Sequence, residues 1–166
     1  RVRARFRVYQ TMAGMDKASV ADVKAVIRGD ALHVSAATAK ALLSADLLPY
    51  DEFNPPIDEA ELDAYLSGLH TRKFSQKALR ANEPAPAALS IPDDICHYRE
   101  ARTLSVREMA RIQSFPDSFE FRGIPTTGGA RRRYQVPQYT QIGNAVPPLM
   151  ARRLGMVVNA ILKELE

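Results

Sequence analysis

The chain contains a single cysteine, Cys96, among its 166 residues, so it cannot form an internal disulfide. One unpaired cysteine is typical of a reducing, intracellular setting, and we expect a cytoplasmic protein. No apolar run reaches the length of a membrane span, and the opening residues lack the pattern of a signal peptide. We therefore expect no membrane partner.

Motifs that carry chemistry on their own are also missing. The sequence has no Gly-rich phosphate loop, no nucleophile elbow and no convincingly spaced pair of carboxylates. The three histidines, His33, His70 and His97, are scattered, and no cluster of metal ligands surrounds Cys96. His97 does not make Cys96 a nucleophile, because neighbouring residues of an extended chain point to opposite sides. Neither a metal site nor catalysis by Cys96 is expected.

What the chain does have is an ordinary globular composition, 46% hydrophobic and 25% charged, with a net charge of +4 and a pI near 9.4. This modest excess of positive charge permits nucleic-acid binding without requiring it. Several arginines cluster near residue 1, and three more are consecutive: Arg131, Arg132 and Arg133. These three form either a solvated basic loop or a set of contacts to phosphates.

Periodicity predicts several elements. Residues 1–9 (RVRARFRVY) alternate arginine with an apolar residue, which predicts a strand with one cationic and one apolar face. The cationic face is either solvated or directed at an anion. Helices are predicted over residues 19–29, 35–44 and 58–69 from apolar residues at helical spacing.

Residues 102–117 (RTLSVREMARIQSFPD) form the clearest local unit. Ser105 and Glu108 have the spacing of a capping box, in which each side chain satisfies the other residue's end of the helix start. Pro116 is expected to end this helix.

A second helix start lies in the string YTQIGNAVPP at residues 139–148. Two prolines, Pro147 and Pro148, fit only the first turn of a helix, which would then run to about residue 165. Asn144 is predicted to cap this helix, and the free N–H groups that follow could instead bind an anion or a polar ligand.

Two of these stretches resemble sequence blocks of the cytosine-5 DNA methyltransferases. RTLSVREMARIQSFPDSF resembles the ninth block, Arg-x-Leu-Thr-x-Arg-Glu-x-Ala-Arg-x-Gln-x-Phe-Pro, with Ser105 in place of threonine. QIGNAVPP resembles the tenth block. RVRARFRVY is similar in part to the eighth block: Arg3 and Arg5 match its two arginines, and Arg1 stands where the family has glutamine.

The resemblance implies an α/β fold class: the C-terminal portion of an S-adenosylmethionine-dependent methyltransferase fold (Rossmann-like), with a small, largely helical target-recognition domain. Residues 1–12 would be a strand of the catalytic domain. Residues 13–98 would form the target-recognition domain. Residues 99–166 would contain the ninth and tenth blocks and return to the catalytic domain.

The resemblance also implies an activity, the transfer of a methyl group from S-adenosyl-L-methionine to C5 of a cytosine that is flipped out of the duplex. Arg3 and Arg5 would be the catalytic residues, holding the flipped base and a phosphate. Asn144, Ala145 and Val146 would line the cofactor site. The capped helix would brace the recognition region, with Arg107 structural rather than catalytic.

Double-stranded DNA is the expected partner, in a prokaryotic or phage-type setting whose role would be restriction-linked, regulatory or phage-borne. The predicted DNA contacts are positively charged side chains: Arg3, Arg5, Arg72, Lys73, Arg131, Arg132 and Arg133. No metal is expected.

Three motifs of the family are missing from these residues: the Phe-x-Gly-x-Gly cofactor loop, the Pro-Cys nucleophile and Glu-Asn-Val. We therefore expect the chain alone to be inactive, as a fragment, a split subunit or a truncated copy. The apolar faces of residues 2–8 and of the stripe from Met150 to Leu165 predict a partner, either an N-terminal methyltransferase subunit or a second copy. The alternatives are a non-enzymatic DNA-binding or regulatory remnant and a protein-interaction domain.

Overall fold

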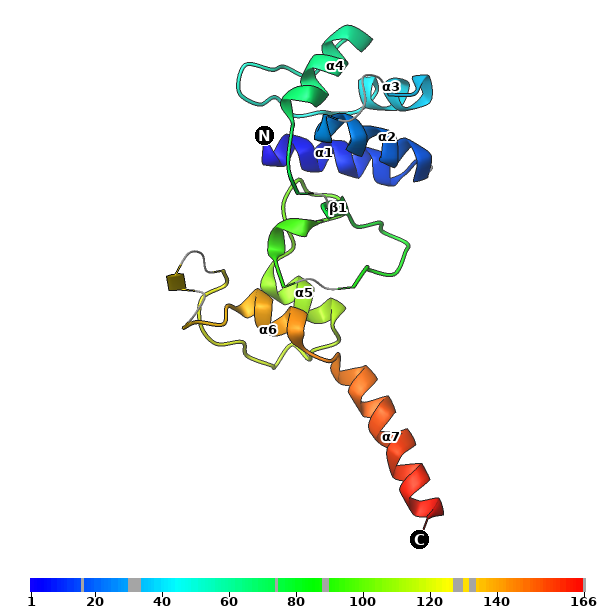
Figure 1. Ribbon diagram of the computed structural model, residues 1–166, viewed down its shortest axis with the longest axis vertical. Helices are drawn as coiled ribbons and strands as arrows, with labels where there is room; N and C mark the ends of the chain where they lie inside the picture. The colour runs from blue at the N-terminus through cyan, green and yellow to red at the C-terminus, as the bar shows by residue number, and fades with distance from the viewer. Residues whose placement is uncertain are drawn as a thin grey trace. The chain divides into compact units, whose positions relative to one another are not determined.

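The computed structural model describes residues 1–15, 17–29, 34–73, 75–87, 90–126, 130–131 and 134–165, apart from the side chains of residues 17–19. The chain divides into two compact units (Figure 1). Unit 1 consists of Arg1–Pro84 and Asp93–Thr103, and unit 2 of Ala85–Pro92 and Leu104–Glu166.

Unit 1 is largely helical. Its helices are α1 (Val2–Ala13), α2 (Lys17–Arg28), α3 (Ala36–Leu43) and α4 (Glu59–Gly68), followed by strand β1 (Lys77–Ala78), the 3₁₀ turn η1 (Pro92–Asp94) and strand β2 (Ile95–Cys96). The three helices predicted over residues 19–29, 35–44 and 58–69 are confirmed. Strands β1 and β2 pair in parallel, with Lys77 opposite Ile95. This short ladder is the only sheet in the described residues, so they show little of the predicted α/β character.

The strand predicted over residues 1–9 is wrong, because these residues lie in helix α1. Residues that alternate in a strand also include pairs four residues apart, such as Val2 and Phe6, which would lie on one face of a helix. A short stretch of this kind therefore fits the period of a helix as well as that of a strand. The residues that follow decide between them: Tyr9 and Met12 extend the buried face at helical spacing, and arginine and alanine favour helix. The arginines of this stretch therefore do not all share one face, as the predicted strand required.

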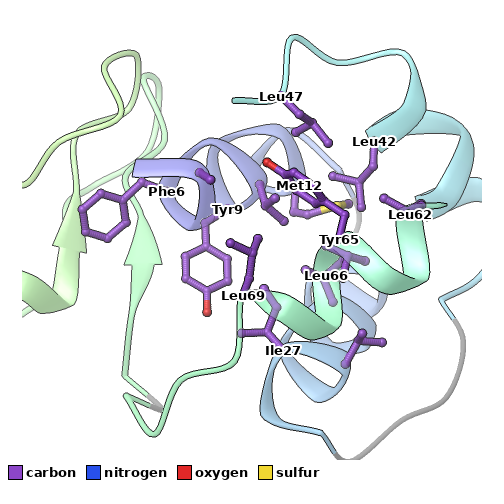
Figure 2. Packing of buried hydrophobic residues seen from close by; sticks show 14 of the residues in the cluster. Phe6, Tyr9, Met12, Ile27, Leu42, Leu47, Leu62, Tyr65, Leu66 and Leu69 are labelled. Carbon is purple, nitrogen blue, oxygen red and sulfur yellow. The ribbon is translucent and has the colours of Figure 1, made fainter. Parts of the chain in front are cut away.

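The core of unit 1 is built by all four helices. Met12 and Leu42 point into a common interior with Tyr65 and Leu66, and Phe6 extends the same cluster toward the strands (Figure 2). Phe6 is 2% exposed and Met12 is fully buried. Residues 1–12 are thus part of the same compact unit as most of residues 13–98, rather than a separate strand.

Two tyrosines fix the segment between α3 and α4. The Tyr50 hydroxyl donates to the Tyr65 carbonyl, and the Tyr65 hydroxyl donates to the Leu48 carbonyl at 2.5 Å. Gly68 leaves room for this arrangement, because a Cβ there would collide with the Tyr50 hydroxyl and lie 3.0 Å from the Phe53 ring. Both hydroxyls are thereby satisfied inside the core.

Alkaline pH should destabilise unit 1. Burial raises the pKa of Cys96, Tyr50 and Tyr65 to about 12, from ordinary values of 9.0 for cysteine and 10.0 for tyrosine. Between the ordinary and the raised pKa the folded state keeps protons that the unfolded state loses. The contribution of these three groups to the free energy of unfolding should therefore be fully present below pH ~9 and then fall by up to ~1.4 kcal/mol per pH unit for each group.

Urea unfolding at a series of pH values from about 8 to 11 would measure this loss. Cys96→Ala should remove the part of the slope that begins near the ordinary cysteine pKa of 9.0. A free energy of unfolding that does not change over this range would contradict the prediction.

Unit 2 contains helices α5 (Val106–Ile112), α6 (Gln138–Asn144) and α7 (Pro148–Glu164). Helices α5 and α6 enclose a small core of Met109, Ala110, Tyr139 and Ile142. The change from unit 1 to unit 2 falls between Thr103 and Leu104, a few residues beyond the predicted boundary at residue 99.

Helix α7 has no buried residue in this chain. Its apolar side chains are all more than half exposed: Leu149, Met150, Leu154, Met156, Val157, Val158, Ile161, Leu162 and Leu165. The segment Gln138–Glu164 is long and apolar enough to cross a membrane, judged on length and composition only. However, an extended Ala145 separates α6 from α7, and α7 alone is only ~25 Å long and carries Arg152 and Arg153.

Candidate functional site

The ninth-block helix α5 is held at both ends by its own side chains. The predicted capping box forms: the Ser105 side chain accepts from the Glu108 N–H at 3.2 Å, and the Glu108 carboxylate accepts from the Ser105 N–H at 2.7 Å. Beyond its end, Arg107 donates to the Pro116 and Phe119 carbonyls at 3.3 and 2.8 Å. These contacts agree with the structural role expected of Arg107, which orders the turn after the helix.

Ser114 joins the ninth block to helix α7, which begins at the last residue of the tenth block. It follows α5 in the left-handed region, with a φ of 62°, and its Oγ accepts from the backbone N–H of Leu149 at 3.1 Å. Leu149 is in the first turn of α7, where N–H groups have no partner within the helix. Ser114 thus caps α7 from a segment 35 residues away.

The predicted capping role of Asn144 is wrong. Asn144 is the last residue of α6, and α7 begins three residues later with Pro147 as its N-cap and Pro148 in the first turn. The prolines start α7 as predicted. A proline N-cap has no side-chain acceptor, which explains why the cap comes from Ser114.

The three predicted cofactor residues lie together at the corner between α6 and α7. Ala145 is extended, with a φ of −78° and a ψ of 146°, and it separates the exposed Asn144 from Val146, which is 59% exposed. The Asn144 amide has no hydrogen-bond partner among the described residues. A free amide beside two apolar side chains fits one wall of a site for a ligand that has both polar and apolar parts.

Helix α6 is itself anchored by side chains that the sequence reading did not single out. The Tyr139 hydroxyl donates to the Leu104 carbonyl at 2.6 Å. Gln138 and Gln141 donate to carbonyls of the preceding loop, including that of Phe121 at 2.7 Å and that of Arg122 at 2.9 Å. No sequence signal marks such bonds, because their partners are backbone groups of a distant loop.

Arg5 is a buried residue of unit 1 rather than an exposed cation. It is 6% exposed, and its guanidinium donates to the carbonyls of Leu69 at 3.0 Å and His70 at 3.4 Å and to the Gln76 amide oxygen at 3.2 Å. Leu69 and His70 follow α4, so Arg5 satisfies carbonyls at the negative end of that helix. Burial lowers the pKa of Arg5, although a guanidinium stays charged at neutral pH.

Arg3 lies two residues earlier on α1 and is exposed, so the two predicted catalytic arginines do not share a face. Their catalytic roles stay predictions, and the strand on which they were based is a helix. Of the predicted DNA contacts, Arg72 and Arg131 are exposed, and Lys73 pairs with Asp93. The predicted contacts Arg132 and Arg133 lie outside the described residues.

Cys96 has the environment of a structural thiol. It is fully buried in strand β2, its Sγ lies 3.2 Å from the His97 carbonyl, and burial raises its pKa to about 12. A thiol that stays protonated at neutral pH is a poor nucleophile. The described residues contain no group of His, Cys, Asp and Glu that could hold a metal ion.

The two stretches that resemble family blocks thus lie almost entirely in one compact unit, where the capped helix α5 is bonded through Ser114 to the proline-started helix α7. The sequence profile of the family described as "C-5 cytosine-specific DNA methylase" matches residues 36–160, well over half of the chain. The chain belongs to this family. The match includes both blocks and leaves out residues 1–9, which resemble part of the eighth block.

Individual relatives are similar over shorter stretches. Type II methyltransferase M.DdeI of Desulfomicrobium norvegicum is 44% identical over 84 residues, 49% of this chain and 20% of that protein. Type II methyltransferase M.AquIB of Picosynechococcus sp. is 38% identical over 85 residues, 50% of this chain and 61% of that protein. Type II methyltransferase M.AgeI of Thalassovita gelatinovora is 33% identical over 121 residues, 63% of this chain and 26% of that protein. No solved structure matches the chain significantly.

The chain thus spans between a fifth and three fifths of these relatives. M.AquIB is itself shorter than the 166 residues of this chain, because 85 aligned residues make up 61% of it. A protein named as a methyltransferase can therefore be as short as this one.

Proposed function

We propose that the chain is the part of a DNA (cytosine-5)-methyltransferase that contributes target recognition and one wall of the S-adenosyl-L-methionine site. Unit 1 contacts double-stranded DNA, and unit 2 joins the catalytic part of the enzyme, which has the Rossmann-like sheet. The observation that carries this proposal is the family match over residues 36–160, which includes the ninth and tenth blocks. The Ser114 to Leu149 bond supports it by joining the ninth block to the helix in which the tenth block ends.

The chemistry requires groups beyond these residues. S-adenosyl-L-methionine supplies the methyl group when it is bound. In this family a cysteine of a Pro-Cys motif attacks the base, and these 166 residues contain no such motif. The nucleophile therefore comes from a catalytic part that carries it. The residues of this chain would hold and orient the cofactor. Asn144, with its free amide, would bind polar atoms of the cofactor beside Ala145 and Val146.

The exposed apolar stripe of α7 is the surface that the catalytic part would cover. An unpartnered patch of this kind is rare on a stable monomer. The relatives are named as Type II methyltransferases, which supports a restriction-linked role on DNA in the bacterial cytoplasm.

Reconstitution tests the proposal. The chain is mixed with a catalytic part that carries the Pro-Cys and Gly-rich motifs, and transfer of labelled methyl groups to duplex DNA is measured. We expect transfer by the mixture and none by either part alone. A folded mixture that binds DNA without transferring methyl groups would instead support a non-enzymatic DNA-binding or regulatory protein.

Asn144→Ala should raise the KM for S-adenosyl-L-methionine several-fold in this assembly with little change in kcat, because one neutral hydrogen bond is worth ~1 kcal/mol. Asn54→Ala is a matched control, since Asn54 is an exposed asparagine in unit 1. An unchanged KM in Asn144→Ala would remove this residue from the cofactor site.

A further inference from the structure

Unit 1 has a pocket whose lining carries an excess of positive charge. The pocket has a volume of about 550 Å³ and lies between the start of α1 and residues 99–103. Arg3 and Arg7 line it from α1, and Arg99 and Arg102 line it from the other side, together with a single carboxylate, that of Glu100. Four arginines and one glutamate leave an excess of three positive charges.

The carboxylate in this pocket is already engaged. Glu100 accepts from Arg102 Nε at 2.8 Å, and Arg102 also donates to the Thr103 carbonyl at 3.0 Å. The other three arginines, Arg3, Arg7 and Arg99, have no acidic partner among the described residues. They are the cations that an incoming anion would meet.

Within the described part of the chain, Arg7 also lacks a hydrogen-bond acceptor for part of its guanidinium group. Its Nε atom is buried and has no hydrogen-bond acceptor among the described residues, which is rare for a buried donor. Arg3 and Arg7 are also four residues apart on α1, where like charges on one helix face repel each other. An anionic oxygen in the pocket would relieve the repulsion and offer acceptors to these guanidinium groups.

We propose that Arg3, Arg7 and Arg99 bind one phosphate of the DNA backbone. The proposal rests on the proposed function for the choice of DNA as the source of the phosphate. It also separates the two arginines at the start of α1: Arg3 faces the ligand, whereas the buried Arg5 supports the fold. Such a contact positions the duplex and reads no sequence.

The test measures the Kd of the full chain for a labelled duplex between about 50 and 200 mM salt. The variant R3Q/R7Q/R99Q should bind at least about tenfold more weakly at the low-salt end, since three charge-assisted contacts are lost. The slope of log K against log salt should fall by about one, the value for one phosphate. R3Q/R99Q changes only exposed residues, so it should stay folded and show a smaller loss in the same direction.

Arg1→Gln is the matched control, because Arg1 lies at the same end of α1 but pairs with Asp51 at 2.5 Å. It changes the net charge by the same amount as Arg3→Gln and should leave the slope unchanged. The proposal is overturned if R3Q/R99Q binds DNA like R1Q, if the wild-type chain does not bind DNA at low salt, or if the arginines bind inorganic phosphate without affecting DNA affinity. If the arginine variants bind DNA normally while the assembled enzyme transfers methyl groups, the phosphate site is wrong and the proposed function stands. If DNA binding depends on the arginines but the assembly transfers no methyl groups, the phosphate site stands and the proposed function is wrong.

Discussion

Replacing Arg5 by methionine should lower the free energy of unfolding of unit 1 by about 3 kcal/mol. The substitution keeps most of the packing of the side-chain stem and removes its donors. The Leu69 and His70 carbonyls and the Gln76 amide oxygen then lose hydrogen bonds in a site closed to water. Gln76 is 1% exposed and also donates to the Asp93 carbonyl at 2.8 Å, so the loss extends to the residues before β2.

Urea unfolding followed by circular dichroism measures this effect. Arg3→Met is the matched control, because it removes the same charge from an exposed position of the same helix and should change the stability by less than about 0.5 kcal/mol. DNA affinity should show the opposite order: Arg3→Met should bind DNA more weakly than Arg5→Met when both variants are folded. A stable Arg5→Met protein with a selective loss of methyl transfer would instead support the predicted catalytic role of Arg5.

The second large effect concerns helix α7. Leu154→Asp combined with Ile161→Asp should weaken association with the catalytic part at least about 100-fold, because burial of each side chain is worth ~1.5–3 kcal/mol and a buried unpaired carboxylate costs more. Methyl transfer by the mixture should be lost with it. At dilutions where the chain alone is monomeric, its free energy of unfolding should not change, since both residues are 52% exposed and the helix buries nothing here.

Association is measured by sedimentation of the chain with and without the catalytic part. Asn159→Asp is the control, because it places a carboxylate on the polar face of the same helix. The chain alone should self-associate at micromolar concentration through the same stripe. If the chain sediments as a monomer both alone and with the catalytic part, the docking role of α7 and the predicted partner are both wrong.

Local signals in the sequence were sufficient for several elements. Ser105 and Glu108 predict the capping box of α5, and both of its hydrogen bonds form. Pro147 and Pro148 predict the start of α7 for the same kind of reason, since a proline in this position lacks only an N–H that the helix would not use. Each of these features depends on residues within one helical turn of one another.

Contacts between distant segments could not be predicted. Asn144 has the right type for an N-cap, yet the cap of α7 is Ser114, whose partner lies 35 residues away. Arg5 belongs to an alternating stretch, yet its partners at Leu69 and His70 are more than 60 residues away. The nine-residue alternation fits two periods, and the residues that follow it, together with packing against α2, α3 and β1, select the helical one.

The sequence by itself determined the family blocks, the capping box, the proline-started helix and the clustering of arginines near residue 1. Only the tertiary structure decided which of those arginines is buried against the end of α4 and which lines a pocket. The physical reason is burial. A guanidinium exchanges its hydration for the carbonyls of another segment only when the fold brings that segment to it, and the identity of that segment is not encoded next to the arginine.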